Sequence, residues 1–356
     1  GSATRINSQG LIEEVANGVS RLNYPMIDGK VVGCPHHILE PQSTNLVDYC
    51  ESFENYFNVS EVTLNSNNAI SPDGTLDANK VTFPSASKSM YNNGLSFSGT
   101  HTVSFWYKGE GSNIGKTFNV RLALGASAQN FNVTLESGWK RFEAQNNGLQ
   151  VIEITNRNNT TIGTGSLLLY GFQVEAGSYP TSYIKTNGSA VTRAAETANG
   201  SGDASTFNDS EGVLMAEISA LADDETDRFV GINDGSNSNR IVIGYTSVSS
   251  NTPRVIVTSG GATQAAIDFS ISDITETIKI LAKYKLNDVD LWINGYKVGS
   301  DTSATMPIGL NNCSFDSDGV GGTDFYGNTK QVQYYDSVLT DSELEQLTSW
   351  TSFTDM

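Results

Sequence analysis

The sequence predicts an all-β protein made of two antiparallel β-sandwiches, with an extended N-terminal lead-in and one short C-terminal helix. Three observations support this fold class. The chain has 356 residues, enough for two domains of about 150 residues each. Only 17% of the residues are charged, so much of the polar surface must come from Asn, Ser, Thr and Gly, which favour turns over helices. Apolar and polar residues alternate along several short segments, as they do in half-buried strands.

The first 48 residues predict an ordered lead-in. They show no clear period and contain short extended pieces, such as residues 10–15 and 21–24. A turn signal at Asn17-Gly18 separates these two pieces. We therefore expect residues 1–48 to be ordered without forming a domain of their own.

Residues 49–196 predict the first sandwich. Within residues 102–107, Val103, Phe105 and Tyr107 fall on one face of an alternating strand. Further expected strands are residues 117–124, 131–135 and 166–174. Gly and Asn turns separate these short strands, a pattern typical of a β-sandwich.

A change of composition predicts where the two domains join. Residues 187–210 are mostly small and polar, and we place the linker at residues 197–210. The second sandwich then covers residues 211–356. Its expected strands are residues 213–218, 228–232, 240–245, 254–257, 277–284 and 290–298. Asn294-Gly295 predicts a tight hairpin turn, because a type I′ turn needs positive φ at both central residues.

One helix is expected near the C-terminus. Thr340 and Glu343 have the spacing of a capping box, in which each side chain satisfies a backbone N–H at the start of the helix. Leu344 and Leu347 then share one helical face. We expect this helix to pack across a sheet edge or the mouth of the sandwich.

The charge balance argues against two kinds of partner. The chain has 21 Lys and Arg residues against 39 Asp and Glu residues, a net charge of −18. Nucleic-acid binding needs clustered basic residues, so no nucleic-acid partner is expected. No apolar run approaches the roughly 20 residues that cross a bilayer, so no membrane insertion is expected.

Three cysteines are too few for a disulfide framework. They are Cys34, Cys50 and Cys313. Three buried thiols are favoured over a Cys34–Cys50 pair.

Six segments in the first 196 residues carry a resemblance. They are residues 3–5 with 10–12, then 21–24, 38–46, 70–75, 172–184 and 191–195. In this order they resemble a region common in phage tail and virion structural proteins, although Ser43 stands where that family usually has Arg. Residues 49–184 also resemble the jelly rolls of carbohydrate-binding modules. The resemblance implies a jelly-roll sandwich, and such modules often carry a structural Ca²⁺.

The second half carries a different resemblance. Its segments are residues 291–295, 325–327 and 331–344. They resemble concanavalin A-like (laminin-G-like) lectin domains, which implies a second jelly-roll sandwich. Function stays open, because this fold hosts lectins, glycanases, lyases and spacers.

Trp292, Asn294 and Tyr296 are the expected ligand-binding residues. Sugars present apolar C–H faces that stack on Trp or Tyr, and hydroxyls that pair with Asn. Alternation turns Leu291 and Ile293 to one side of the strand and Trp292 to the other, beside Asn294. An exposed Trp among polar neighbours would be a stacking surface for a sugar. A subunit contact and packing under a loop are the alternatives.

Asp316, Asp318 and Asp324 are the expected metal ligands. They lie on a Gly-rich loop, and Ca²⁺ takes six to eight oxygen ligands from such loops. Their spacing is not that of an EF-hand. A solvated acidic turn is the alternative interpretation.

No catalytic residues are assigned. The sequence has no Gly-x-Ser-x-Gly and no Gln-x-His triplet, and its carboxylates suggest no defined pair for glycoside hydrolysis. With the two resemblances, this favours a phage virion appendage, a tail fibre or tail tip, that binds host cell-surface polysaccharide non-covalently. The resemblance implies a location in the virion, contact with other virion proteins and a homotrimer. A structural spacer or decoration protein without a ligand and a polysaccharide depolymerase remain as alternatives.

Overall fold

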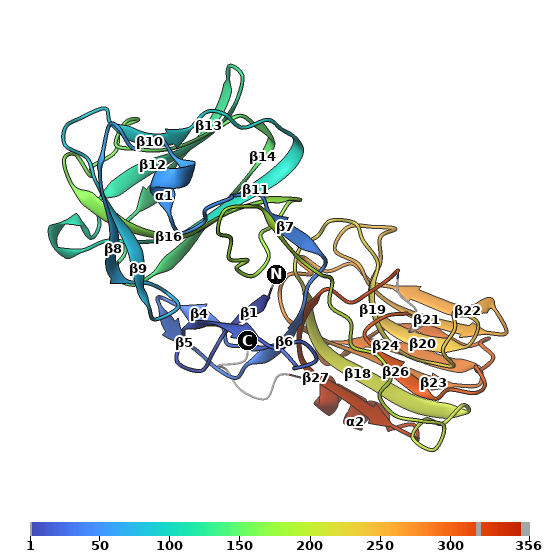
Figure 1. The fold of residues 1–356 in the computed structure, drawn as a ribbon. Helices are drawn as coiled ribbons and strands as arrows, with labels where there is room; N and C mark the ends of the chain where they lie inside the picture. The colour runs from blue at the N-terminus through green and yellow to red at the C-terminus, as the bar shows by residue number, and fades with distance from the viewer. Residues whose placement is uncertain (1, 318–321, 350–356) are drawn as a thin grey trace. The chain divides into compact units, whose positions relative to one another are not determined.

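The computed structural model describes residues 2–317 and 322–349. Strands make up 49% of the chain and helices 4%, which confirms the expected all-β fold. The chain forms two units (Figure 1), which we call the N-terminal unit (Gly1–Pro35 and Gln42–Ala195) and the C-terminal unit (His36–Pro41 and Glu196–Met356). The expected lead-in is thus divided between the units, and residues 197–210 belong to the C-terminal unit. No described helix is long and apolar enough to span a membrane.

The N-terminal unit consists of strands and two short helical turns. These are β1 (Ala3–Ile6), β2 (Ile12–Val15), β3 (Leu22–Asn23), β4 (Met26–Ile27), β5 (Lys30–Val31), β7 (Ser43–Asn45), α1 (Phe53–Tyr56), β8 (Thr63–Ile70), β9 (Leu76–Thr82), β10 (Ser89–Asn92), β11 (Phe97–Lys108), η1 (Gly111–Asn113), β12 (Thr117–Leu124), β13 (Ser127–Thr134), β14 (Lys140–Leu149), β15 (Val151–Thr155), β16 (Ser166–Ala176) and β17 (Val191–Arg193).

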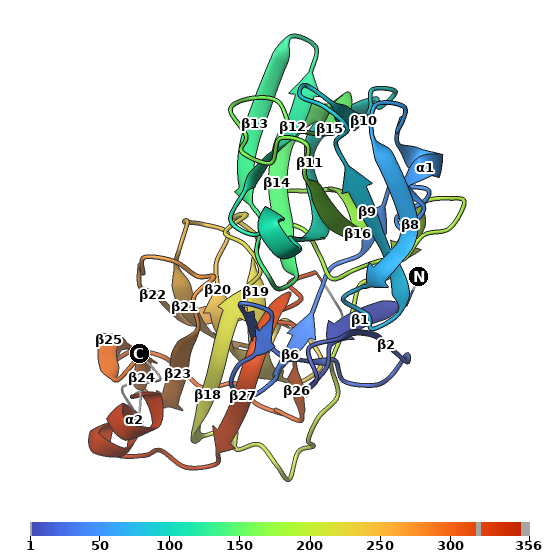
Figure 2. The same ribbon diagram turned by 90° about the vertical axis from the view of Figure 1, so that its left-hand side faces the viewer.

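Two antiparallel sheets enclose the core of this unit. One has the strand order β10-β15-β12-β13 and the other the order β14-β11-β16-β9-β8. Figure 2 shows β10, β12, β13 and β15 together along one side of the unit. The inner faces meet in an apolar core, where the ring of Phe105 stacks on those of Phe142 and Phe172 at centroid distances of 4.9 and 4.7 Å. The predicted alternation of residues 102–107 therefore places Phe105 at the centre of the sandwich.

A buried side-chain amide ties the strands of the N-terminal unit together. Asn45 on β7 is fully buried, and its Nδ2 donates hydrogen bonds to the carbonyl oxygens of Phe172 and Ile184 at 3.2 and 2.9 Å. Its Oδ1 accepts from the backbone N–H groups of Val47 and Val174 at 3.1 and 3.2 Å. One side chain thus fastens β7 to β16 and to the segment that follows β16.

Glu175 on β16 forms a second buried polar centre. Its Oε1 accepts hydrogen bonds from the hydroxyls of Ser43 and Thr181, both at 2.5 Å, and its Oε2 accepts from Nε2 of Gln173 at 2.6 Å. These bonds offset the cost of burying a carboxylate. Ser43 therefore has a structural role as one of the donors to this carboxylate.

The C-terminal unit consists of the following elements. They are β6 (His36–Leu39), β18 (Glu211–Ala220), β19 (Arg228–Asn233), β20 (Arg240–Tyr245), β21 (Pro253–Ser259), β22 (Ala262–Asp268), β23 (Ile278–Lys285), β24 (Asp288–Ile293), β25 (Tyr296–Asp301), β26 (Asn312–Ser314), β27 (Gly327–Tyr335) and α2 (Asp341–Thr348). One antiparallel sheet of this unit runs β25-β24-β23-β18-β27-β6, and the other runs β22-β21-β20-β19-β26. Apolar residues of both sheets form the core between them.

Helix α2 covers part of an outer sheet face. Its capping box is confirmed: the Thr340 hydroxyl accepts from the N–H of Glu343, and the Glu343 carboxylate accepts from the N–H of Thr340 at 2.8 Å. Leu344 is fully buried and packs with Leu281 and Trp292. The helix therefore lies on the outward side of β23 and β24, toward the β25 edge of the sheet.

The three cysteines are free thiols. Cys50 is buried and Cys313 is half-buried, whereas Cys34 is exposed. The expectation of a buried thiol is therefore wrong for Cys34.

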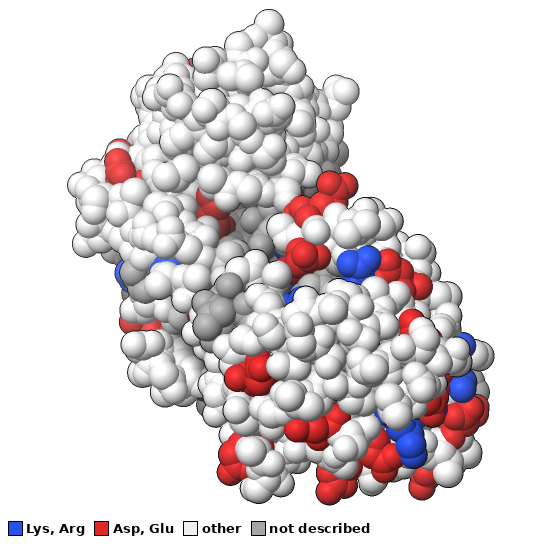
Figure 3. Space-filling model, turned by 90° about the vertical axis from the view of Figure 1, so that its right-hand side faces the viewer, with Lys and Arg blue, Asp and Glu red and all other residues white. Residues whose placement is uncertain are grey.

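Charge is distributed unevenly between the units. The N-terminal unit has 13 Lys and Arg residues against 14 Asp and Glu residues, a net charge of −1. The C-terminal unit has 8 against 25, a net charge of −17. In the view of Figure 3, Asp and Glu atoms accordingly outweigh Lys and Arg atoms over the C-terminal unit. Nearly all of the acidic excess therefore belongs to one unit.

Replacing Asn45 with Ala should lower the free energy of unfolding by about 2–4 kcal/mol, because it leaves buried backbone donors and acceptors without partners. Urea denaturation followed by tryptophan fluorescence measures this loss. The matched control is Asn68→Ala at an exposed position of β8, for which we expect a change within about 0.5 kcal/mol. Equal effects of the two substitutions would contradict the structural role of Asn45.

Candidate functional site

The structure places Trp292 beneath α2. As the alternation predicts, Leu291 and Ile293 face the core between the sheets, and Trp292 faces the other side of β24. There Trp292 is only 5% exposed, packs with Leu344, and has the Nζ of Lys297 at 5.6 Å from its ring centre. Trp292 is therefore not the exposed stacking surface that the sequence predicts, because the helix covers the indole.

Asn294 and Tyr296 lie at the hairpin between β24 and β25. Asn294 and Gly295 have φ values of +48° and +88°, so the turn has positive φ at both central residues, as predicted. The Asn294 Oδ1 accepts a hydrogen bond from the N–H of Lys279 at 2.9 Å. This side-chain oxygen therefore stabilises the turn. Tyr296 is 74% exposed, whereas the nearby Trp292 is only 5% exposed. A ligand at Asn294 or Tyr296 stays a prediction.

The Asp residues of the predicted Ca²⁺ loop differ in their surroundings. Asp316 is fully buried, and its Oδ1 accepts hydrogen bonds from the N–H of Ser317 at 2.6 Å and from the hydroxyl of Thr323 at 2.9 Å. Burial raises the pKa of the Asp324 carboxyl, and the nearby charge of Asp316 raises it further. Asp318 lies outside the described residues. Calcium at this loop therefore stays a prediction.

A different group of carboxylates meets in the N-terminal unit. Glu51 lies before α1, Asp73 lies in the turn between β8 and β9, and Asp77 lies on β9. Each offers an oxygen within 4.8 Å of the oxygens of the other two. Oxygen-rich clusters of this kind suit Ca²⁺. No local sequence pattern indicates this group, because Glu51 is remote in sequence from the two Asp residues and only the fold brings them together.

Hydrogen bonds and one ion pair hold this acidic group in place. The Tyr170 hydroxyl lies 3.0 Å from Glu51 Oε1 and 2.9 Å from Asp73 Oδ2, and Lys185 Nζ lies 2.8 Å from Glu51 Oε2. Burial disfavours the charged form of Asp73, but its hydrogen bonds outweigh burial and lower its pKa. Asp77 Oδ1 is buried and accepts no hydrogen bond from the described residues. An acceptor without a donor is a suitable position for a cation.

A polar row crosses the outer face of the sheet β10-β15-β12-β13. We call it the outer row: Tyr91 pairs with Glu153, Glu153 with Arg121, and Arg121 with Asn130. Directly opposed residues of antiparallel strands share a face, so the row is continuous. With neighbouring strands about 4.8 Å apart, it spans roughly 14 Å. The alternation of residues 117–124 predicts that Arg121 points away from the core, but only the strand order shows which side chains lie beside it.

Glu153 is the fixed centre of the outer row. Its side chain is 8% exposed, and its two oxygens lie 2.8 Å from Nη1 of Arg157 and 3.5 Å from Nη1 of Arg121. Arg157 also donates to the Ser87 carbonyl and forms an ion pair with Glu61 at 3.3 Å. Glu153 is therefore held mainly by Arg157, and Arg121 has only a long contact with it.

A loop borders the outer row on one side. Asn158 and Asn159 have φ values of +60° and +61°, which turns the loop onto the sheet. The Nδ2 of Asn158 donates to Oδ1 of Asn119 at 3.1 Å and to Oδ1 of Asn130 at 2.9 Å. The bond to Asn130 orients the amide of that residue. The Nδ2 of Asn130 donates no hydrogen bond to any residue that the structure describes. Asn130 itself is exposed.

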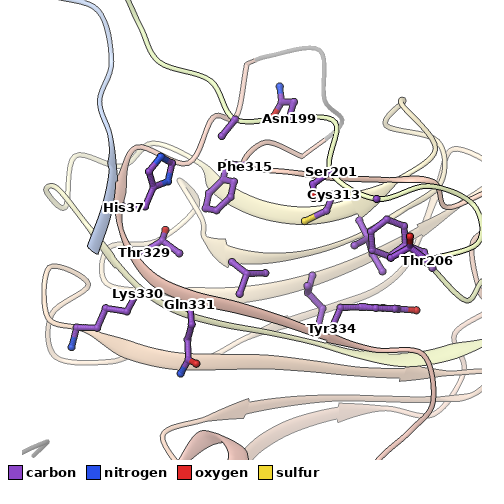
Figure 4. Close-up of a pocket in the computed structure, with 16 residues that line it drawn as sticks. His37, Asn199, Ser201, Thr206, Cys313, Phe315, Thr329, Lys330, Gln331 and Tyr334 are labelled. Carbon is purple, nitrogen blue, oxygen red and sulfur yellow. The ribbon is translucent and has the colours of Figure 1, made fainter. Parts of the chain in front are cut away.

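A pocket of about 560 Å³ lies in the C-terminal unit. Figure 4 shows the sulfur of Cys313 between Phe315 and Thr206. The wall is mainly apolar and includes Phe207 and Leu214. Burial raises the pKa of the Cys313 thiol to about 11, so the thiol stays protonated at neutral pH and is a poor nucleophile. This pocket therefore suits a hydroxyl-rich ligand less well than the outer row does.

Comparison with known proteins gives distant structural similarity. No protein-family model and no curated protein matches the chain. Among solved structures, the CBM40 domain of the Ruminococcus gnavus IT-sialidase is 16% identical, covers 44% of this chain and 97% of its own, and gives a TM-score of 0.36. The SAP-like pentraxin of Limulus polyphemus is 12% identical over 42% of this chain and 74% of its own, with a TM-score of 0.33. Domain 4 of the Geobacillus stearothermophilus arabinanase AbnA, solved with arabinotriose, is 16% identical over 46% and 74%, with a TM-score of 0.32.

We expect Ca²⁺ to stabilise the protein through Glu51, Asp73 and Asp77. At a hundredfold excess over its dissociation constant, a ligand of the folded state contributes about 2.7 kcal/mol, which raises the melting temperature by several degrees. Differential scanning calorimetry with CaCl₂ and with a chelator measures the shift, and Asp77→Asn should remove it. Asp316→Asn serves as the comparison. If only this variant loses the Ca²⁺-dependent rise in melting temperature, the ion binds at the predicted loop and not at Glu51, Asp73 and Asp77. No shift in the unaltered protein would contradict both sites.

Proposed function

We propose that the N-terminal unit binds glycans through the outer row, and that the chain is part of a phage virion appendage that attaches to host cell-surface polysaccharide without altering it. The observation that carries this proposal is the outer row itself. It presents an aromatic ring, a guanidinium and a side-chain amide side by side on one sheet face.

The chemistry of the outer row matches that of a saccharide. Sugar hydroxyls both donate and accept hydrogen bonds, and the row offers the Asn130 amide and the Arg121 guanidinium. Sugar C–H faces are apolar and flat, and the half-buried ring of Tyr91 lies at the other end of the row. Polar groups thus stand next to an aromatic surface, the combination that saccharide recognition requires.

Two residues of the outer row have side-chain partners that fix their positions in the structure. Glu153 is held by Arg157, and Asn130 is held by Asn158. A preorganised site loses little conformational entropy on binding, which matters for ligands that form only weak individual contacts. The sheet and its bordering loop therefore supply a surface that is ready to bind.

The outer row supports binding more than hydrolysis. Glycoside hydrolysis usually needs two carboxyl groups that flank the scissile bond. Within the row, Glu153 is the only carboxylate, and its two oxygens face Arg157 and Arg121. The row thus lacks the second carboxyl group, and we propose that it binds a glycan without cleaving it.

The phage assignment is supported by the six sequence segments quoted above. In the structure, three residues from these segments, Asn45, Gln173 and Glu175, form the buried polar centres that fasten β7 to β16. The segments therefore contribute to one structural frame. In a homotrimer, three copies of the outer row would convert weak single-site affinity into firm attachment. Other virion proteins would hold the trimer in the particle.

Removal of polar or aromatic groups from the outer row should weaken glycan binding. We expect Asn130→Ala to lower affinity about fivefold, the equivalent of one neutral hydrogen bond, and Tyr91→Ala to lower it by a similar factor or more. A glycan array followed by biolayer interferometry on the best ligand measures both effects. Asn68→Ala, an exposed Asn on β8 of the other sheet, is the matched control and should bind as the unaltered protein does. The proposal fails if no saccharide binds, or if all three variants bind equally well.

A further inference from the structure

The outer row has an excess of unused hydrogen-bond donors. The Arg121 guanidinium carries five N–H donors, yet its one hydrogen-bond or ion-pair partner among the described residues is Glu153, at 3.5 Å. Its side chain is 31% exposed. The Nδ2 of Asn130 faces no described acceptor, and the Tyr91 hydroxyl accepts from Nδ2 of Asn58 at 3.1 Å, which leaves its own proton available.

The acceptors of the row are already occupied. Both oxygens of Glu153 face arginines, and Oδ1 of Asn130 accepts from Asn158. A ligand that supplies acceptors therefore fits this pattern better than one that supplies donors. Compared with the hydroxyl and acetamide groups of sugars, a carboxylate supplies more acceptor capacity, and its planar shape matches the fork of an arginine in a bidentate pair.

The charge distribution favours the same ligand. Arg157 lies closer to Glu153 than Arg121 does, so the positive charge of Arg121 is compensated only in part. The N-terminal unit has a net charge of only −1, whereas the C-terminal unit carries −17 and repels anions. At physiological ionic strength, charges farther than about 8 Å are largely screened. A carboxylate at the outer row would therefore respond mainly to the local guanidinium.

We propose that the glycan bound by the outer row is acidic, and that Arg121 binds a sugar carboxylate while Asn130 and Tyr91 donate to neighbouring oxygens. This inference rests on the proposed glycan-binding function and names its ligand class. The shared chemistry is a carboxylate on a pyranose, whether it belongs to a uronic acid or to a sialic acid.

The test uses matched acidic and neutral probes on the full chain. The first pair is an oligogalacturonate and the same oligosaccharide after reduction of its carboxyl groups, and the second pair is 3′-sialyllactose and lactose. We expect at least one acidic probe to bind more than tenfold more tightly than its neutral partner. The pair that shows the difference distinguishes a uronate from a sialic acid. Added NaCl should weaken binding of the acidic probe and leave the neutral probe nearly unaffected.

Variants at Arg121 separate charge from geometry. Arg121→Gln should lower affinity for the acidic probe about 10- to 100-fold, as expected for hydrogen bonds to a charged group, and Arg121→Lys should restore part of it. Arg5→Gln is the control, because Arg5 is exposed to a similar extent and pairs with Glu13 away from the row. Circular dichroism and the melting temperature verify that each variant is folded.

The outcomes distinguish this inference from the proposed function. If the acidic and neutral probes bind equally, or if Arg121→Gln binds the acidic probe as well as Arg5→Gln does, the ligand class is wrong while glycan binding stands. If no saccharide of either kind binds, the proposed function fails and this inference fails with it.

Discussion

The alternation of side chains along a β-strand is the constraint on which both units depend. Each strand of a sandwich gives one face to the core, as Phe105 does in the N-terminal unit and Leu291 in the C-terminal unit. The other face must then be covered, or it must carry polar groups that tolerate water. The C-terminal unit covers part of its outer face with α2, and the N-terminal unit lines its outer face with the polar row from Tyr91 to Asn130.

These two outcomes explain why similar local patterns have different roles. Trp292 and Arg121 both point away from a core, and both stand between apolar residues that face it. A large apolar ring on an outer face gains about 1.5–3 kcal/mol from burial, and α2 supplies the cover through Leu344. A guanidinium gains nothing comparable from apolar cover, so Arg121 stays partly exposed beside Glu153. The indole of Trp292 is therefore packed beneath α2, whereas the guanidinium of Arg121 stays partly exposed on the outer face.

Buried polar centres join the strands of the N-terminal unit through satisfied hydrogen bonds. Asn45 and Glu175 satisfy their hydrogen bonds within β7, β16 and the segments beside them. On the outer face, Glu153 and Arg157 fix the floor of the row in the same way. Because these groups are already ordered, a ligand at the surface would find its partners in place, and repetition in an oligomer would multiply the gain.

The sequence by itself determined the all-β class, the positive-φ turn at Asn294 and the capping box at Thr340. Each of these depends on residues within a few positions of one another, whose geometry follows from local sterics and hydrogen bonding. Only the tertiary structure decided that α2 covers Trp292, that Glu51 meets Asp73 and Asp77, and that Arg121 stands between Glu153 and Asn130. Those contacts join segments that are remote along the chain, and they depend on strand order and sheet packing, which no local spacing of residues encodes.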